Sequence, residues 1–433
     1  MRKKETFTVP NSSQFKANAM HWAQQFNEVV WLDGNHHQQR YSSFDALLAV
    51  DALTCIETDY NNAFNDLKEY QQYTQDWIFG YLSYDLKNDV ERLTSKNDDG
   101  LGFADIFFFQ PKKIMVLRGD QLEVLYLPMV DDELQEDVRT LLKDDVNSQE
   151  AETHHPIKIK LKIFKDDYFD RVQKMLAHIH RGDIYEANFC QEFYAEDTVI
   201  DPLSIYKKLN SISRPPYSCF LKNYDKYALC SSPERYIKRE GDTIISQPIK
   251  GTAKRAKDKA EDKGLKEQLE HDVKERSENI MIVDLVRNDL SKSAIKGSVE
   301  VEELCKVYSF DQVHQMISTV KATVPKDKNS VDLIKETFPM GSMTGAPKIS
   351  AMKIIEELEA TKRGLYSGAI GYFSPDGDFD FNVVIRSILY NETNKYVSCS
   401  VGSAITAMAS PEKEYEECLV KAKAMREVLE GNT

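Results

Sequence analysis

The stretch Ser246-Gln247-Pro248-Ile249-Lys250-Gly251-Thr252 decides how the rest of this sequence is interpreted. The β-prone residues at 243–246 predict a strand, and Pro248 interrupts its pairing because proline has no amide hydrogen to donate. Gly251 then allows the backbone to pass close to a neighbouring segment. We expect Lys250, between them, to lie at the rim of a sheet, where burial would lower the pKa of its amine and make it a nucleophile. The local alternative is an ordinary lysine that points into solvent.

The composition limits the possible partners. The 433 residues suffice for two or three domains or for one large α/β unit, and 41% are hydrophobic, enough for an extensive core. A formal net charge of -14 argues against nucleic acid or an anionic membrane surface as a partner. An anionic substrate would therefore need locally placed cations or a metal ion.

Location and redox state follow from segments that the sequence lacks. No apolar run approaches the roughly 18 residues of a membrane-spanning helix, and residues 1–20 have no signal-peptide core. The seven cysteines are scattered and odd in number, which argues against a disulfide scaffold or a zinc ribbon. We expect a cytoplasmic protein.

Two parts of unequal size are expected. Residues 1–150 form a strand-rich part that ends in an acidic, helix-prone stretch, 130–156, which we interpret as an exposed connection. Residues 151–433 form the larger part. Within it, the run 227–246 predicts a hairpin with its turn at Gly241, directly before the stretch quoted above.

Two predicted helices carry paired carboxylates. In the helix at 272–289, Glu275 and Glu278 are spaced i,i+3, and the apolar residues that continue their face turn it toward the interior. In the helix at 414–429, Glu414 and Glu417 repeat this spacing next to Lys421. Carboxylate oxygens are the ligands that Mg²⁺ prefers, so the four glutamates are candidate ligands. Either pair alone could equally be a solvated helix face.

Three further features bear on an anionic ligand. A glycine-rich turn at 338–348 precedes a predicted helix, whose first amides attract anions, but it lacks the ending of a nucleotide-binding P-loop. Arg386 lies inside an apolar predicted strand, 381–389, and needs either a substrate carboxylate or a structural acidic partner. His314 has a half-apolar setting typical of a packed, hydrogen-bonded histidine. The residues alone thus indicate an α/β protein that binds a carboxylate-bearing anion with Mg²⁺ and has a candidate lysine nucleophile.

The order and number of short motifs carry a family resemblance. The matching runs are Ser232-Pro233-Glu234-Arg235, Pro248-Ile249-Lys250-Gly251-Thr252, 278–289, 341–348, 371–373, 385–387 and the pair Glu414 and Glu417. The chain resembles the chorismate-utilising enzymes of the anthranilate synthase and aminodeoxychorismate synthase component I group, closely from 156 onward and loosely at 41–45 and 79–85. The resemblance implies an α/β fold of antiparallel β-sheets packed face to face with helices outside. It places a chorismate-binding catalytic domain at 151–433, with the active site in a cleft between two subdomains.

The residue before Gly251-Thr252 sorts the branches of this group. Anthranilate synthases carry alanine there and aminodeoxychorismate synthases carry lysine, so Lys250 points to the second branch, which serves folate through p-aminobenzoate. The resemblance implies that Lys250 attacks ring carbon two of chorismate while Glu234 protonates the hydroxyl that leaves carbon four. Ammonia then enters at carbon four and expels the lysine, which gives 4-amino-4-deoxychorismate.

The resemblance also assigns the other site residues. Glu278 and Glu417 would hold Mg²⁺ directly, and Glu275 and Glu414 would do so through water. Arg386 and Tyr366 would bind the enolpyruvyl carboxylate. The substrate-binding positions that match the family pattern are Gly251, Thr252, His314, Thr344, Gly345, Tyr366, Arg386, Gly402, Ser403 and Lys421.

Ammonia must come from a partner. No cysteine lies in a glycine-flanked nucleophile turn, so the chain has no glutaminase of its own, and the resemblance implies a separate glutamine amidotransferase subunit. Two positions depart from the pattern. Glu186 stands where these branches usually have glutamine, and isochorismate synthases a lysine, so it either receives ammonium or is protonated. Ala404 replaces a glycine in a Gly-x-Gly turn.

Three alternatives stay open. Anthranilate synthase component I is the main one, isochorismate synthase is less favoured, and a non-catalytic scaffold that binds a glutaminase belongs to a different class.

Overall fold

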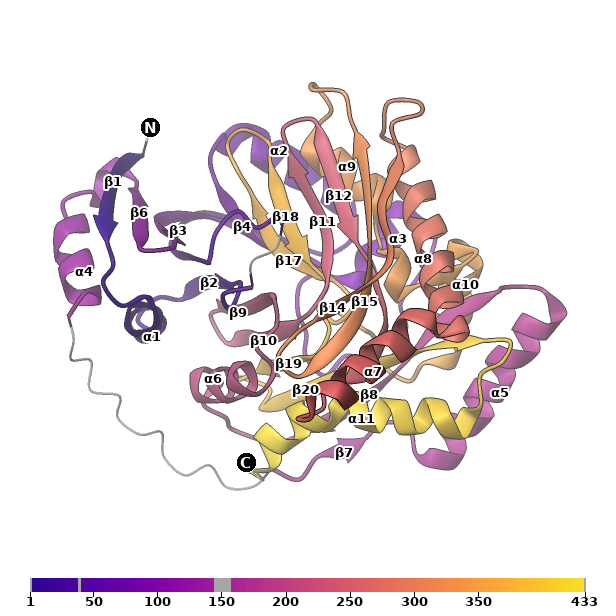
Figure 1. The fold of residues 1–433 in the computed structure, drawn as a ribbon. Coiled ribbons are helices and arrows are strands. Elements are labelled where there is room, and N and C mark those ends of the chain that lie inside the picture. Colours follow the sequence, from indigo (N-terminus) through magenta and orange to yellow (C-terminus); the bar gives the residue numbers. More distant parts are fainter. Residues whose placement is uncertain (1, 38–39, 144–156, 432–433) are drawn as a thin grey trace.

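Antiparallel pairing joins twenty strands into one hydrogen-bonded network in the described part of the chain (Figure 1). The structure is a computed structural model that describes residues 2–37, 40–143 and 157–431. The strands are β1 (Lys3–Thr8), β2 (Glu28–Asp33), β3 (Ala46–Thr58), β4 (Ile78–Leu82), β5 (Ile106–Arg118), β6 (Gln121–Tyr126), β7 (Lys160–Leu161), β8 (Glu186–Ala195), β9 (Tyr217–Asn223), β10 (Lys226–Ser232), β11 (Arg235–Glu240), β12 (Thr243–Gln247), β13 (Ile249–Lys254), β14 (Glu300–Ser309), β15 (Val313–Thr323), β16 (Gly345–Ala346), β17 (Ala369–Phe373), β18 (Phe379–Asn382), β19 (Ser387–Asn391) and β20 (Tyr396–Thr406).

Helices cover the sheet network. They are α1 (Ser12–Ala23), α2 (Ala63–Thr74), α3 (Lys87–Val90), α4 (Leu134–Leu141), α5 (Lys165–Arg181), α6 (Pro202–Ser213), α7 (Lys259–His271), α8 (Val273–Ser291), α9 (Ser330–Thr337), α10 (Lys348–Leu358) and α11 (Pro411–Glu430), with short 3₁₀ turns at Tyr84–Leu86, Pro128–Val130 and Gly341–Met343. Among the described residues, no helix is long and apolar enough to cross a membrane.

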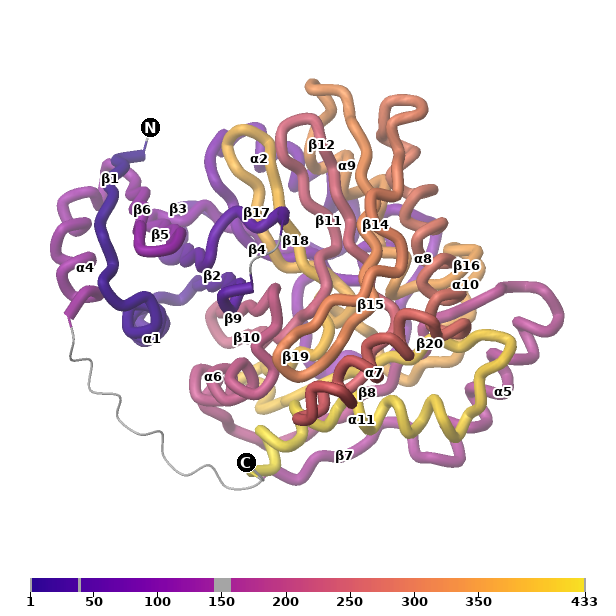
Figure 2. The backbone as a smooth tube through the Cα atoms, viewed as in Figure 1, coloured from indigo at the N-terminus to yellow at the C-terminus, as the bar shows by residue number. Residues whose placement is uncertain are grey.

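Strands from distant parts of the sequence lie side by side. β2 pairs with both β3 and β9, and β4 pairs with both β5 and β17. Figure 2 shows the purple tube of β4 next to the yellow-orange tube of β17. The strands that precede residue 150 are therefore hydrogen-bonded to strands that follow it. The domain boundary at residue 150 stays a prediction.

Alternating side chains build two hydrophobic cores. Along β2, Val30 belongs to one core, and its neighbours Val29 and Trp31 belong to the other, because successive strand residues point to opposite faces. The first core gathers side chains of β4, β5, β17 and β18 with those of α2, α8 and α9. The second lies between the sheet network and α1, α4, α5, α6, α10 and α11. The predicted mixed fold of antiparallel sheet with helices outside is confirmed.

The hairpin before the opening stretch forms as predicted. β11 and β12 pair across a turn at Gly241, whose positive φ of 63° suits a residue without Cβ. β12 ends at Gln247 and β13 begins at Ile249, so Pro248 separates the two strands that flank it. The local rule for proline in sheets thus predicted this boundary.

The acidic stretch at 130–156 is more than an exposed connection, which corrects our prediction. Its described part contains α4, whose Leu134 and Val138 are buried in the second core. The buried ammonium of Lys113 forms ion pairs with Glu133 at 2.6 Å and with Asp137 at 2.5 Å. The apolar residues of α4 and the ion pairs with buried Lys113 therefore hold this stretch against the core, although its many charges indicated an exposed segment. Residues 144–156 lie outside the described residues.

Candidate active site

Lys250 lies at an irregularity in the sheet rather than in solvent. The pairing of β13 with β15 shifts register between Ile249 and Thr252, and Gly251 has a positive φ of 89°. A Cβ on Gly251 would lie 3.1 Å from an oxygen of Glu275, so glycine lets α8 approach closely. The Lys250 side chain is 13% exposed, and its ammonium forms an ion pair with Glu186 at 3.2 Å. The alternative of a solvated lysine is therefore wrong.

The electrostatics of Lys250 correct one expectation. Burial alone lowers the pKa of its amine, as the sequence argument assumed. The negative charges of Glu186, Glu278 and Glu417 and the hydrogen bond to Glu186 act the other way, and the pKa is raised overall. Lys250 therefore rests as an ammonium and must lose a proton before it can act as a nucleophile.

Glu234 is a buried carboxyl held by its backbone. It follows β10, its amide donates to the Ser232 hydroxyl at 3.2 Å, and its carbonyl accepts from the Val383 amide at 3.0 Å. Burial raises the pKa of its side chain to about 7, against smaller lowering effects of Ser342 and of the Lys250 charge. A carboxyl that keeps its proton near neutral pH can serve as a general acid.

The carboxylates of α8 lie at the start of a helix capped by Asp272, whose side chain accepts from the Glu275 amide at 2.9 Å. Glu278 is 8% exposed, and its Oε1 is buried without a hydrogen-bond partner among the described residues. Burial raises the pKa of Glu278 to about 7, although the charges of Lys250 and Lys274 oppose the rise. The second half of α8 carries charged as well as apolar residues. Asp284 and Arg287 are exposed there, so it buries one face only.

The carboxylates of α11 face those of α8 across a lysine. Lys274 Nζ lies 3.8 Å from Glu278 Oε1 and 3.8 Å from Glu414 Oε1, so one ammonium spans both helices. Glu414 is buried and accepts a hydrogen bond from the Ser403 hydroxyl. Glu417 is more open and pairs with Lys421 at 2.6 Å.

The carboxylate oxygens of α8 and α11 are of the type that binds a divalent cation. As the described side chains stand, no three acidic, histidine or cysteine residues are close enough to hold an ion together. The orphaned Glu278 oxygen and the ammonium that bridges Glu278 and Glu414 nevertheless mark a place where positive charge is needed. Hard oxygen donors of this kind match Mg²⁺.

Arg386 differs from the prediction in its backbone, and its binding partner stays a prediction. It lies between β18 and β19, not inside a continuous strand, and has a left-handed φ of 54°. In the described part of the chain its guanidinium forms no ion pair with an acidic side chain. Burial lowers its pKa, while Tyr366 and Glu417 act to raise it. Arg386 and Lys421 line a cavity of about 280 Å³. The structural acidic partner left open by the sequence is therefore not found among the described residues, which favours a ligand anion.

The segment Gly402-Ser403-Ala404 is strand, not turn, which corrects our prediction. These residues lie inside β20 and pair with Cys190, Phe189 and Asn188 of β8. Glycine is required at 402 because a Cβ would come within 2.2 Å of Asn188 Oδ1, while Ala404 fits the strand. Lys421 donates to the Gly402 carbonyl at 2.7 Å and so ties α11 to this strand.

The remaining predicted substrate residues are placed in different ways. His314 is buried, with Nδ1 2.9 Å from the Ser309 hydroxyl and Nε2 3.1 Å from Asp262 on α7, so its hydrogen bonds are structural. Thr252 is exposed on β13. Thr344 is buried and donates to the Gly341 carbonyl at 3.2 Å. A Cβ on Gly345 would lie 2.2 Å from the Glu186 carbonyl, so glycine lets β16 pair with β8.

The sequence did not reveal the contacts of two residues near the site. Glu186 was noted as a departure from the pattern, yet nothing local showed that its carboxylate contacts Lys250, 64 residues away. Lys274 lies four residues before Glu278, a spacing that places them on one helix face and could have revealed it.

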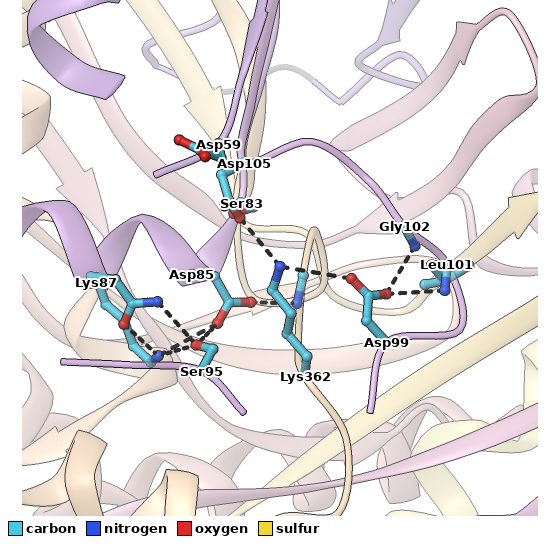
Figure 3. A network of polar contacts seen from close by, with 12 residues as sticks. Asp59, Ser83, Asp85, Lys87, Ser95, Asp99, Leu101, Gly102, Asp105 and Lys362 are labelled. Carbon is cyan, nitrogen blue, oxygen red and sulfur yellow. Dashed lines mark hydrogen bonds and ion pairs between the residues drawn. The ribbon is translucent and has the colours of Figure 1, made fainter. Parts of the chain in front are cut away.

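A network of polar contacts fixes the loop that leads to Tyr366 (Figure 3). Lys362 approaches Asp99 and Asp105 at 3.7 Å each, and the Gly364 amide donates to Asp85 at 2.8 Å. Arg363, which lies between Lys362 and Gly364, donates to the Asn188 carbonyl at 2.8 Å. The N-terminal segment 83–105 thereby holds Lys362 and Gly364, which shortly precede the buried Tyr366.

Comparison with known proteins agrees with this geometry. The family model for chorismate binding enzyme matches residues 20–427. The chain is 35% identical over 371 residues to the anthranilate synthase component I-like protein of Synechocystis sp., covering 86% of this chain and 76% of that one. It is 32% identical to aminodeoxychorismate synthase component 1 of Bacillus subtilis, covering 87% and 80%. The structure of anthranilate synthase component I from Streptococcus pneumoniae matches with a TM-score of 0.78 and 27% identity, over 90% of this chain and 94% of that one. The chain belongs to the chorismate-binding enzyme family.

Proposed function

We propose that this enzyme aminates chorismate to 4-amino-4-deoxychorismate, the reaction of aminodeoxychorismate synthase component I. The observation that carries the proposal is the position of Lys250. It is a buried lysine at the register shift of β13, and its charge acts on the Glu234 carboxyl, whose pKa is about 7. A nucleophile and a proton donor are thus available in one place.

The two groups divide the chemistry between them. The free amine of Lys250 attacks ring carbon two, and Glu234 gives its proton to the hydroxyl that leaves carbon four as water. Ammonia then bonds to carbon four and the lysine departs from carbon two. Arg386, which has no acidic partner among the described side chains, pairs with the enolpyruvyl carboxylate beside Tyr366.

Glu278 and Glu417 would hold Mg²⁺, with Glu275 and Glu414 nearby to bind its waters. The ion would neutralise the ring carboxylate and the acidic pocket together. The chain's own part is to supply oxygen ligands on two helices, with Lys274 moving away from Glu278 and Glu414.

Ammonia comes from a glutamine amidotransferase subunit under this proposal, and the pair works in the cytoplasm. Support for the partner is the name "component 1" borne by relatives such as the Bacillus subtilis protein. Support for the branch is the lysine at position 250.

The test is to incubate the chain with chorismate, MgCl₂ and ammonium chloride and to separate the products by liquid chromatography with mass detection. Formation of aminodeoxychorismate supports the proposal, and accumulation of anthranilate refutes the branch. Glu278→Ala should abolish turnover, whereas Glu270→Ala, an exposed glutamate of α7, should not. A chain that turns over nothing and binds no Mg²⁺ would instead fit a scaffold.

Anthranilate formation is the second candidate. Its support is the name of the Synechocystis relative and the likeness to the Streptococcus pneumoniae structure. The product analysis above separates the two.

A further inference from the structure

The ion pair between Lys250 and Glu186 has a feature that an ordinary structural pair lacks. Glu186 is 2% exposed, its Oε1 accepts from Lys250 Nζ at 3.2 Å, and its Oε2 is buried without a hydrogen-bond partner among the described residues. Only half of this carboxylate is used by the resting protein. A buried acceptor left open in this way calls for an explanation, and a catalytic role is one such explanation.

Both members of the pair are fixed by backbone, so the contact cannot easily open. Glu186 is flanked on β8 by Ala346 of β16 and Thr406 of β20, and the close approach of Gly345 holds β16 in place. Lys250 is set by the left-handed Gly251 that follows it. The two side chains therefore face each other at hydrogen-bond distance before any substrate arrives.

Lys250 has to release a proton in a place that solvent barely reaches. Its side chain is 13% exposed, and its raised pKa means that it rests as an ammonium. The charged groups that act on it from the surrounding elements are Glu186, Glu234, Glu275, Glu278 and Glu417. Glu234 is the proton donor to the leaving hydroxyl, and the three glutamates on α8 and α11 are the proposed cation ligands. Glu186 is the carboxylate that remains, and its Oε1 is in hydrogen-bond contact with Lys250 Nζ.

We propose that Glu186 is the catalytic proton acceptor for Lys250, taking a proton from its ammonium before attack and returning it when the lysine leaves. This inference rests on the proposed function. In the first half of the reaction, Lys250 Nζ gives one proton to Glu186 and forms a bond to carbon two. The carbon–oxygen bond at carbon four breaks, and the proton of Glu234 converts the leaving hydroxyl to water. When ammonia bonds to carbon four, the Lys250 nitrogen–carbon bond breaks with its electrons on nitrogen. Glu186 then restores the ammonium, and the new amine gives a proton back to Glu234.

The pH profile of Lys250 reactivity tests this proposal. A proton that passes within the pair makes the fraction of reactive Lys250 amine independent of pH, as long as the pair keeps one shared proton. A proton that passes to solvent makes that fraction rise about tenfold per pH unit. We would measure, without ammonia, the rate at which Lys250 acquires a chorismate adduct between pH 6 and 8, using mass spectrometry with MgCl₂ present. Glu234 donates its proton in the same step and has a pKa of about 7, so its deprotonation lowers the rate in every variant alike, and the rates are compared as ratios. The ratio of the Glu186→Gln rate to that of the unaltered chain is expected to rise with pH, whereas the ratio for Glu186→Asp stays constant and below one.

A second readout does not depend on chorismate chemistry. Acetic anhydride labels free amines, and Lys250 labelling is compared over the same pH range with that of Lys263, an exposed lysine of α7, in the same sample. We expect Lys250 labelling to be independent of pH in the unaltered chain and to rise with pH in Glu186→Gln. Circular dichroism checks that each variant is folded. Equal profiles in the two proteins would overturn the role of Glu186. Flat labelling in the unaltered chain without any chorismate adduct would instead refute the proposed function and leave the proton transfer supported.

Discussion

Two buried clusters of charged side chains differ in how many of their polar atoms have hydrogen-bond partners. In the Lys87 cluster (Asp85, Lys87, Asn88 and Ser95), Lys87 Nζ contacts all three partners, and Asp85 also accepts the Gly364 amide (Figure 3). In the Lys250 cluster (Glu186, Glu234, Lys250 and Glu278), Glu186 and Glu278 each keep one oxygen without a hydrogen bond among the described residues. A closed cluster holds the chain together, whereas an open one keeps capacity for charges that arrive with reactants.

The largest expected difference concerns activity. Lys250→Met should lower product formation by roughly a thousandfold or more, because the nucleophile is gone. Lys87→Met should leave activity per folded molecule within several-fold of the unaltered chain. Turnover of chorismate, normalised to folded protein, measures both. Comparable losses in the two variants would abolish the distinction between the clusters.

The second difference concerns stability. Lys87→Met should reduce the free energy of unfolding by about 3 to 5 kcal/mol, because it leaves the buried carboxylate of Asp85 without its cation. Denaturant titration measures the change. An exposed pair offers the matched control: Lys263→Met, which loses only Glu267, should change stability by less than about 1 kcal/mol. A similarly small loss for Lys87→Met would contradict the structural role.

The open cluster also predicts a pH dependence of stability without metal. The pKa of Glu234 is about 7 in the folded chain against an ordinary 4.5, so the folded state binds more protons between these values. Its stabilising effect is complete below pH 4.5 and is lost as pH rises through 7. The loss is on the order of 3 kcal/mol between pH 5 and 8. Denaturant titration at both pH values should show a smaller fall for Glu234→Gln, and an unchanged fall would sink the assignment.

The smallest effect concerns Lys274. Its side chain is half exposed, yet its ammonium lies between Glu278 and Glu414, where it competes with a cation. Lys274→Gln should therefore tighten Mg²⁺ binding by roughly two- to fivefold, as expected for the loss of weak ion pairs. Calorimetric titration with MgCl₂ measures this, with Lys263→Gln as the control. Weaker binding in Lys274→Gln would show that the lysine supports the site instead.

Features set by neighbouring residues were predictable from the sequence. The turn at Gly241, the break at Pro248 and the carboxylate spacing on α8 all depend on residues a few positions apart. The helix predicted at 272–289 spans Val273–Ser291, and the side chain of Asp272 caps it.

Features set by distant partners were not predictable. Gly402 resembles a turn residue until β8 supplies its pairing partner, Cys190. The raised pKa of Lys250 depends on Glu186, which no periodicity connects to it. Arg386 interrupts its strand because its backbone is left-handed, a conformation that an apolar run does not indicate.

The pairing of β4 with β17 has a consequence for synthesis of the chain. Gly80 and Gly371 are partners although roughly 290 residues separate them. At the roughly 5 to 20 residues per second of translation, one edge of β4 waits roughly 15 to 60 seconds for its partner. An apolar strand edge exposed for that long invites association with other nascent chains. We therefore expect the yield of folded protein to rise when translation is accompanied by chaperones, since the site closes only after α11 has emerged.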